Sequence, residues 1–228
     1  MDIPRFKKLP LMGILRGVDT EVIEPLAEAI VASGIETVEI TMNTSGVLQL
    51  IKKMAKISKQ RLFVGAGTVL DLEMLKGALD SGATFAVTPV LVEEVVGYCV
   101  KHNIAVFPGA FSPQEIYKAW SSGATMVKVF PAKVLGPAYF KEIKGPFSQI
   151  ELLACAGVTA ENLKDYFSSG AAAIAFGASI FKKEWLVKKD FIKITESIRA
   201  ILASYAAFAA KSHCPKSGEC NNGARPRN

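Results

Sequence analysis

The sequence predicts a single α/β domain folded as a (β/α)8 barrel. Eight short apolar segments alternate with segments of helical periodicity along about 210 residues. This alternation is typical of a parallel sheet whose strands are joined by helices. Eight such units match the size of a closed barrel. An open, doubly wound sheet is the alternative architecture.

The predicted strands are short runs of apolar and β-branched residues, bounded by turn-forming residues. We expect strands at 12–15, 37–42, 62–66, 85–88, 105–107, 126–130, 152–155 and 173–176. Between them, apolar residues at helical spacing predict amphipathic helices. These helices are expected at 21–32, 47–56, 72–80, 92–102, 113–121, 137–143 and 160–167, with a final one at about 191–210.

A Ser-Gly dipeptide followed by Ala or Ile closes four of the predicted helices. Its glycines are Gly34, Gly82, Gly123 and Gly170, one in every second strand–helix unit. Glycine at a helix C-terminus takes the left-handed conformation that turns the chain into the next strand. The recurrence therefore supports the barrel. It indicates that these glycines end helices and take no part in the chemistry.

The composition is that of a globular protein. Half of the 228 residues are hydrophobic, and no apolar run approaches the length of a membrane-spanning helix. The first residues do not resemble a secretory signal, and Cys99 and Cys155 lie in core-like stretches, so we expect a reducing cytoplasm. The net charge of +6 comes without a basic face carrying aromatics, which argues against nucleic acid and fits an anionic substrate.

Residues 211–228 differ from the rest of the chain. They are polar, rich in Gly and Pro and without apolar periodicity, which predicts a disordered tail after a barrel of residues 1–210. His213, Cys214 and Cys220 are potential metal ligands, but three side chains on such a tail make a weak site. We therefore predict no metal site.

One predicted strand carries an unexpected charge, Lys128, in the apolar segment 126–130. Burying an ammonium group costs several kcal/mol unless the group is paired or gives up its charge. A neutral amine in a dry pocket is a Schiff-base nucleophile. The alternative interpretation is that Lys128 lies near the strand end and reaches water.

Glu39 is a second charge inside an apolar strand. Strand alternation places Glu39, Thr41 and Asn43 on one face, which lines the barrel if Val38 and Ile40 pack outward. With a buried lysine, this carboxylate forms either a structural ion pair or the proton shuttle of an amine nucleophile. Iminium chemistry needs both groups, because carbinolamine formation, dehydration and α-proton removal each move a proton.

The carboxyl ends of the strands, where barrels place their active sites, offer further polar groups. Arg16 is suited to hold a carboxylate by two parallel hydrogen bonds, although a surface arginine would give the same pattern. Thr68 offers a hydroxyl group after the glycines of the third strand. Gly157, Gly177 and Ser179 precede helical turns, where barrels bind phosphate through backbone N–H groups, although plain tight turns would look the same.

Five segments of the chain resemble the family of 2-keto-3-deoxy-6-phosphogluconate (KDPG) and 4-hydroxy-2-oxoglutarate (KHG) aldolases, small class I aldolases with a (β/α)8 fold. The segments are 38–44, 63–70, 107–116, 127–132 and Lys144-Gly-Pro-Phe-Ser148. They occur in the family's order, and the resemblance runs from about Leu11 to Phe181. The lysine strand followed by Gly-Pro-Phe-Ser is its most specific part.

The resemblance implies that Lys128 forms a Schiff base with pyruvate, that Glu39 shuttles protons and that Thr68 contacts the pyruvyl carboxylate. It also implies a homotrimer that uses no metal or organic cofactor. We expect the substrate to be bound by side chains and turns at the strand ends, namely Arg16, Thr41, Asn43, Thr68, Pro89, Gly157, Gly177 and Ser179.

Three departures from the family pattern fall within the expected site. Asn43 stands where some members have an arginine, so we expect the carboxylate to rest on Arg16. The fourth strand ends Thr88-Pro89-Val90, where Ser-Pro-Gly or Ser-Pro-His is usual. The seventh ends Ala154-Cys155-Ala156-Gly157, where Pro-Thr-Gly-Gly is usual, and the methyl group of Ala156 narrows the approach of a phosphate. The residues expected to bind pyruvate therefore match the family pattern better than the residues expected to bind phosphate.

The sequence thus predicts a lyase that reversibly cleaves a 2-keto-4-hydroxy acid to pyruvate and an aldehyde. The expected substrates are 2-dehydro-3-deoxy-6-phosphogluconate, 4-hydroxy-2-oxoglutarate or both. One alternative is a non-covalent sugar-phosphate-binding barrel, isomerase-like or a binding protein, in which Lys128 and Glu39 form a buried ion pair. An inactive scaffold is a third. The sequence leaves open the aldehyde and the stereochemistry at C4.

Overall fold

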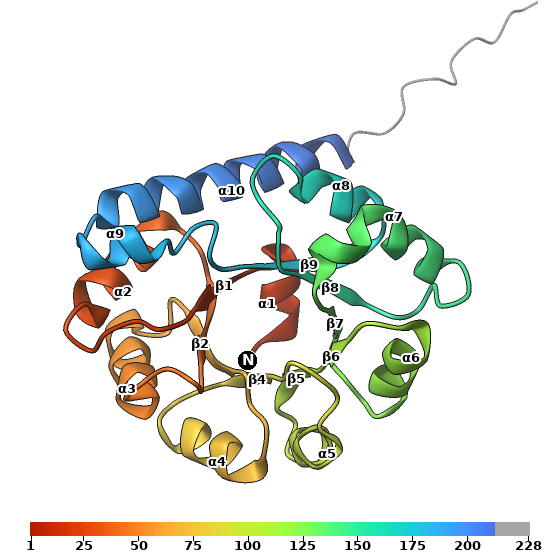
Figure 1. Cartoon of the computed structure of the whole chain (residues 1–228), viewed down its shortest axis with the longest axis horizontal. Helices are drawn as coiled ribbons and strands as arrows, with labels where there is room; N and C mark the ends of the chain where they lie inside the picture. The colour runs from red at the N-terminus through yellow and green to blue at the C-terminus, as the bar shows by residue number, and fades with distance from the viewer. Residues whose placement is uncertain (213–228) are drawn as a thin grey trace, which may run out of the picture.

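The computed structural model describes residues 1–212 and confirms the (β/α)8 barrel, with helices arranged as a ring around the sheet (Figure 1). The strands pair in parallel, in the order β5-β4-β3-β2-β1-β9-β8-β7-β6. They are β1 (Leu11–Leu15), β2 (Thr37–Thr41), β3 (Phe63–Gly67), β4 (Phe85–Val87), β5 (Ala105–Phe107), β6 (Gly109–Ala110), β7 (Val127–Val129), β8 (Leu152–Cys155) and β9 (Ala171–Phe176).

The fifth barrel strand is split at Pro108 into β5 and β6. The first half pairs with β4 and the second half pairs with β7, so that this strand closes the sheet into a barrel. Pro108 has no N–H group for the sheet, but its carbonyl accepts a hydrogen bond of 2.9 Å from the Lys128 backbone N–H. The sequence predicted only the first half, because two residues after a proline carry no periodicity.

The helices that surround the sheet follow the predicted order. They are α2 (Ile23–Ser33), α3 (Val47–Ser58), α4 (Leu72–Asp80), α5 (Glu93–Lys101), α6 (Pro113–Ser121), α7 (Ala132–Lys144), α8 (Leu163–Ser168), α9 (Lys183–Val187) and α10 (Phe191–Ser212). The four Ser-Gly glycines have the expected left-handed conformation, with φ between 93° and 103°. The short α9 was not predicted. Helix α7 begins earlier than its predicted start at residue 137, because Gly136 forms a kink inside the helix and does not precede its first residue.

The tail predicted for residues 211–228 lies outside the described residues, except that Lys211 and Ser212 continue α10. His213, Cys214 and Cys220 also lie outside them. The last helix is thus two residues longer than its predicted end at residue 210. Among residues 1–212, no helix is both long and apolar enough to cross a membrane.

An unpredicted helix, α1 (Ile3–Lys8), closes the amino-terminal end of the barrel. Asp2 caps it by accepting a hydrogen bond of 3.0 Å from the Arg5 backbone, and a proline stands in its first turn. The Phe6 side chain is 1% exposed and meets the Phe107 ring edge to face at 5.8 Å. Figure 1 shows α1 inside the ring of helices. Arg5 anchors the helix to Glu36, just before β2, by an ion pair of 2.7 Å.

The buried side chains form two clusters, one between the sheet and the helices and one inside the barrel. Because alternate residues of a strand face opposite sides, strands such as β1, β8 and β9 contribute to both clusters. The interior cluster consists of Phe6, Met12, Phe85, Val87, Ala105, Phe107, Met126, Leu153, Cys155, Ala173 and Ala175. The Phe107 ring meets the rings of Phe6 and Phe85 edge to face, each at 5.8 Å, so the large rings gather at the end closed by α1.

Gly65 illustrates how tightly the interior is packed. A Cβ atom at this position would lie 2.3 Å from the Phe85 ring. We predict that Gly65→Ala lowers the free energy of unfolding by about 1–3 kcal/mol, because the ring must move in a filled core. Urea denaturation measures the change.

Gly97 in α5 is the matched control, because a Cβ there meets nothing within 4 Å. Gly97→Ala is expected to stabilise the protein by about 0.5–1 kcal/mol through its helix propensity. Equal stabilities of Gly65→Ala and the wild type would contradict the packing described here.

Candidate functional site

Lys128 occupies the middle of β7 and faces the barrel interior. The residue is only 6% exposed, so the prediction of a buried lysine is confirmed over that of a lysine reaching water. Its Nζ lies 5.1 Å from the centre of the Phe130 ring, a cation–π contact at the barrel mouth. Within residues 1–212, its ammonium group has no hydrogen-bond acceptor and no ion-pair partner.

Glu39 lies inside the barrel in β2 and is 2% exposed. Burial raises the pKa of its carboxyl group above the ordinary value of 4.5, and the positive charges of Lys128 and Arg16 oppose this increase only in part. Its Oε2 atom has no hydrogen-bond partner among the described residues. An unsatisfied buried carboxylate oxygen is costly and points to a partner that substrate or water supplies.

The space around Glu39 depends on Gly67 in the neighbouring strand. A Cβ atom on Gly67 would lie 2.6 Å from the Glu39 carboxyl group. No ion pair joins Glu39 to Lys128 in the part of the chain that the structure describes. The two groups therefore influence each other through their charges across a gap, and this arrangement disfavours the interpretation as a structural ion pair.

Arg16 and Thr68 come together at the ends of β1 and β3. The Arg16 guanidinium donates to the Thr68 hydroxyl at 3.4 Å, and the arginine is otherwise exposed at the mouth. Thr68 has a φ of 56°, which is unusual for a β-branched residue and holds its hydroxyl in this position. The pair offers a cation and a hydroxyl side by side, suited to a carboxylate.

Thr41 and Asn43, predicted on the same face as Glu39, have different surroundings. Thr41 is fully buried and its hydroxyl is hydrogen-bonded to that of Thr44 at 3.1 Å. The Thr44 hydroxyl in turn accepts from the Gly17 backbone at 3.0 Å, so these threonines connect the loops after β1 and β2. Asn43 lies beyond the end of β2, in an exposed turn where strand alternation no longer applies.

The turns after β8 and β9 are connected to each other. The Ser179 hydroxyl donates to the Val158 carbonyl at 3.3 Å, and Gly177 accepts two backbone hydrogen bonds of 2.9 Å at the following helical turn. Ala156 and Gly157 both have left-handed φ values, of 78° and 82°. A Gly-Gly pair would adopt this turn without strain, so the alanine adds a methyl group and strain to the place expected to bind phosphate.

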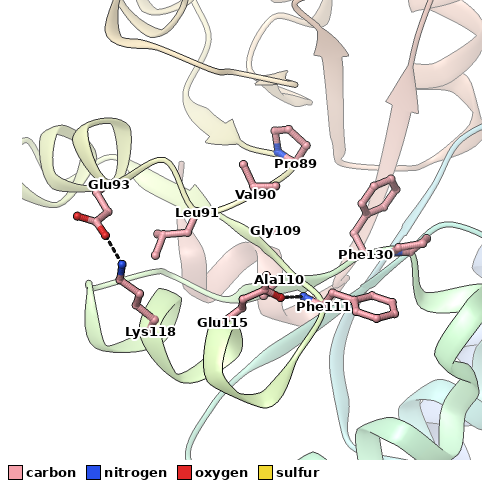
Figure 2. A pocket seen from close by; sticks show the side chains of 11 residues that line it. Pro89, Val90, Leu91, Glu93, Gly109, Ala110, Phe111, Glu115, Lys118 and Phe130 are labelled. Atoms are coloured by element: carbon pink, nitrogen blue, oxygen red, sulfur yellow. Dashed lines mark hydrogen bonds and ion pairs between the residues drawn. The ribbon is translucent and has the colours of Figure 1, made fainter.

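Pro89, the remaining predicted contact, lies in the turn after β4 beside a cleft of about 510 Å³. A Cβ atom on Gly109 would lie 2.0 Å from the Pro89 carbonyl oxygen, so the glycine lets these two strand ends approach. Figure 2 shows Val90, Phe111 and Phe130 around the same cleft. Phe130 connects this cleft to Lys128, because the same ring contacts the lysine.

Cys155 was predicted to be an ordinary core residue, but the structure places it in the interior beside the charged groups. The thiol is 2% exposed, and burial raises its pKa to about 11 against the positive charge of Lys128. The apolar sequence around it does not distinguish the barrel interior from the outer layer. The sequence signal that was available is strand alternation, because Cys155 and Leu153 are two residues apart and therefore share a face of β8.

Metal chemistry has no obvious centre here. Among the described residues, no group of three or more His, Cys, Asp or Glu side chains is placed to hold a metal ion. The polar groups that the strand ends bring to this mouth are an amine, a carboxyl group, a guanidinium group and hydroxyls.

The fold and the site together define a class: a (β/α)8 barrel with a buried lysine and a buried glutamate at the carboxyl ends of its strands. The chain belongs to the KDPG and KHG aldolase family, whose model matches residues 3–197.

Known proteins from three bacteria illustrate the similarity. The 2-dehydro-3-deoxy-phosphogluconate aldolase of Pseudomonas aeruginosa is 33% identical over 87% of this chain and 89% of its own length. The 2-dehydro-3-deoxy-6-phosphogalactonate aldolase of Escherichia coli is 32% identical over 85% and 95%. A crystal structure of the Legionella pneumophila KDPG aldolase, with pyruvate captured as a covalent carbinolamine, matches with a TM-score of 0.78 and 27% identity over 84% and 93%.

The raised pKa of Glu39 predicts a pH-dependent cost to stability. The folded state binds the proton more tightly than the unfolded state, so stability is lost as pH rises from about 4.5 through the folded pKa. Glu39→Gln removes this cost. We predict that, between pH 4 and pH 7, the free energy of unfolding of the variant rises relative to the wild type by up to about 1.4 kcal/mol per pH unit.

Urea denaturation of both proteins at each pH measures this difference. Glu36→Gln is the control, because Glu36 is a half-exposed carboxylate whose ion pair with Arg5 lies at the other end of the barrel. A difference between Glu39→Gln and the wild type that did not change with pH would contradict the burial of an ionisable Glu39.

Proposed function

We propose that this protein is a class I aldolase that reversibly cleaves a 2-keto-4-hydroxy acid to pyruvate and an aldehyde. The observation that carries the proposal is the pair of buried groups in one interior, Lys128 and Glu39, with no ion pair between them among residues 1–212. A lysine and a glutamate that served only to stabilise the fold would form a direct ion pair. Two groups separated by a gap fit an amine and a proton shuttle on either side of a substrate.

Covalent catalysis would begin at Lys128. Its deprotonated amine attacks the C2 carbonyl, an N–C bond forms, and the carbonyl oxygen leaves as water after the carbinolamine is protonated. The resulting iminium withdraws electrons from the carbon chain. When the C3–C4 bond breaks, its electron pair moves toward the iminium nitrogen and the aldehyde is released. Protonation of the enamine at C3 and hydrolysis return pyruvate and free Lys128.

Glu39 would move the protons in this sequence. Its carboxylate, acting through a water, takes the proton of the C4 hydroxyl as the C3–C4 bond breaks and later returns a proton to C3. A pKa raised by burial suits a group that must both accept and release a proton near neutral pH. Arg16 and Thr68, joined at 3.4 Å, would hold the substrate carboxylate.

The relatives support the substrate class. The Legionella enzyme holds pyruvate as a carbinolamine, and the Pseudomonas and Escherichia enzymes are named for phosphorylated 2-keto-3-deoxy sugar acids. We therefore propose 2-dehydro-3-deoxy-6-phosphogluconate, 4-hydroxy-2-oxoglutarate or both as substrates, with no metal or organic cofactor in the mechanism. The turns at Gly157, Gly177 and Ser179 would bind the distal anionic group, with Ala156 narrowing that end.

Reduction with sodium borohydride in the presence of pyruvate tests the proposal. The wild type is expected to gain one reduced pyruvyl group, which intact mass detects and peptide mapping places on Lys128. Lys128→Ala is expected to form no adduct and to lose aldolase activity by at least about 10⁴-fold, because the covalent route is removed.

Lys133→Ala is the matched control, because Lys133 is an exposed lysine in α7, the helix that directly follows β7. It is expected to keep the adduct and the activity. Glu39→Gln is expected to keep the adduct but to turn over about 100-fold more slowly. A Lys128→Ala protein with wild-type turnover would refute the Schiff-base mechanism and favour the non-covalent sugar-phosphate barrel.

We propose further that the chain forms a homotrimer in a reducing cytoplasm. An apolar rim at the mouth, formed by Val90, Phe111 and Phe130, is 57%, 42% and 38% exposed and surrounds the cleft of Figure 2. Contiguous exposed apolar groups of this kind mark protein contacts. The free buried thiols of Cys99 and Cys155 fit a reducing compartment.

Light scattering after size exclusion measures the assembly, and we predict a mass of about three times the 24.5 kDa chain. Val90→Asp introduces a charge into the rim and is expected to shift the protein toward monomer. Val187→Asp, at a valine in α9 that is 70% exposed, is the control and should leave the mass unchanged. A trimer that both variants preserve would contradict the proposed contact.

A further inference from the structure

The turn after β2 lies between the two loops that carry the proposed carboxylate-binding pair, Arg16 and Thr68. Leu15 is the last residue of β1, and Gly67 is the last residue of β3. Arg16 and Thr68 directly follow these residues, so both lie just outside the strands whose pairing fixes the backbone. Their positions therefore depend on hydrogen bonds other than those between the paired strands.

Thr44 connects the loop after β1 to the turn after β2. Its hydroxyl accepts a hydrogen bond of 3.0 Å from the backbone N–H of Gly17, the residue directly after Arg16. Gly17 has a φ of 63°, a left-handed conformation that turns the chain sharply after β1. Thr44 is only 5% exposed, so this hydrogen bond is sheltered from competing water. Holding Gly17 in this way fixes the direction in which the Arg16 side chain leaves the backbone.

A second hydroxyl, that of Thr41, holds Thr44 in place. The two hydroxyl oxygens are 3.1 Å apart, and the Thr44 backbone N–H donates to the Thr41 carbonyl at 2.9 Å. A hydroxyl has one hydrogen and two lone pairs, so Thr44 accepts from Gly17 and shares a further hydrogen bond with Thr41 at the same time. Thr41 is fully buried. Two hydroxyls buried here give the contact a direction that two valines of the same shape would not give.

The same turn is hydrogen-bonded to the strand that leads to Thr68. The Met42 backbone N–H donates to the Gly67 carbonyl at 2.7 Å. Gly67 directly precedes Thr68, whose hydroxyl accepts from the Arg16 guanidinium. The turn formed by residues 42–44 is therefore bonded to both loops, and it sets the separation between the guanidinium and the hydroxyl.

The two side chains of the pair do not hold each other firmly. Arg16 is exposed, and a donor–acceptor distance of 3.4 Å makes its hydrogen bond to Thr68 a weak one. Ordering an exposed arginine costs conformational entropy, and a backbone that already points the side chain toward the site lowers this cost. Two parallel hydrogen bonds to a carboxylate require such alignment.

We propose that Thr44 is a positioning residue that acts through Gly17 to align Arg16 with Thr68 for the carboxylate of the bound keto acid. The inference rests on the proposed Schiff-base function. Thr44 itself does not touch the substrate. Its loss weakens the recognition of the carboxylate and leaves the chemistry of the Lys128 amine intact.

Borohydride trapping with pyruvate and with pyruvamide, its neutral analogue, measures carboxylate recognition without knowledge of the aldehyde. The measured quantity is the concentration giving half-maximal adduct on Lys128, expressed as the ratio of pyruvamide to pyruvate. Thr44→Val keeps the shape but removes the acceptor for Gly17, and the ratio is expected to fall about tenfold, because a misaligned guanidinium loses part of its contact with the carboxylate. The amount of adduct at saturating pyruvate is expected to equal that of the wild type.

Thr44→Ser keeps the hydroxyl and is expected to hold the ratio within about twofold of the wild type. A double-mutant cycle then shows whether Thr44 acts through Arg16. Arg16→Ala removes the guanidinium and lowers the ratio by itself. Adding Thr44→Val to Arg16→Ala is expected to lower the ratio no further, because no guanidinium remains to be aligned. Equal effects of Thr44→Val in the two backgrounds would overturn the inference.

Thr125 provides the matched control at the opposite end of the barrel. Its hydroxyl accepts a hydrogen bond of 2.9 Å from the Val106 backbone N–H, the same kind of contact that Thr44 makes with Gly17. Thr125→Val is expected to lower stability while leaving the ratio within about twofold of the wild type. A purely structural role of Thr44 would give the same result for Thr44→Val.

The outcomes separate the inference from the function beneath it. If the wild type traps pyruvate on Lys128 and folded Thr44→Val keeps the wild-type ratio, the positioning role of Thr44 is refuted and the aldolase proposal stands. Thr44→Ala also lacks the hydroxyl and decides if the valine variant does not fold. A wild type that traps both compounds equally well has no carboxylate recognition for Thr44 to support, which refutes the role as well. If the wild type traps neither compound, the Schiff-base function fails and the inference fails with it.

Discussion

The burial of two ionisable groups that do not touch is the constraint on which the rest of this structure depends. Lys128 and Glu39 lie inside a barrel that is otherwise apolar, and neither compensates the other directly. Such an arrangement costs stability, because each group gives up water without gaining a close partner. The surrounding packing must keep them apart and in place, and Gly67 does this by leaving room for the carboxyl group at the neighbouring strand.

Much of the fold and the centre of the site were readable from the sequence. Alternating apolar and helical segments gave the barrel, and two charges in apolar strands identified Lys128 and Glu39, because such charges are rare without a purpose. The rest depends on relations between strands. The split at Pro108 leaves too few residues for a periodicity, and the interior position of Cys155 follows only from the register of β8 with β7 and β9.

Local chemistry explains the remaining differences. Asp2 and the proline that follows were signals for α1, but a helix of six residues is too short for a periodic pattern. Asn43 was placed on the face of Glu39 because strand alternation was continued past the end of the predicted strand, and β2 in fact ends at Thr41. Ala156 has the conformation of the glycine that the family usually carries there, so the turn is kept at the cost of strain.

Helix α1 closes the amino-terminal end of the barrel and leaves the opposite end open. Phe6 and Phe107 fill the base, and the open end lies at the carboxyl ends of the strands, where Phe130 contacts Lys128. In the proposed reaction the aldehyde portion of the substrate lies between the Schiff base and this open end. Cleavage therefore releases the aldehyde first and the ketoacid last. The reverse reaction must then bind the ketoacid before the aldehyde. The order of substrate binding and product release therefore follows from the single open end of the barrel.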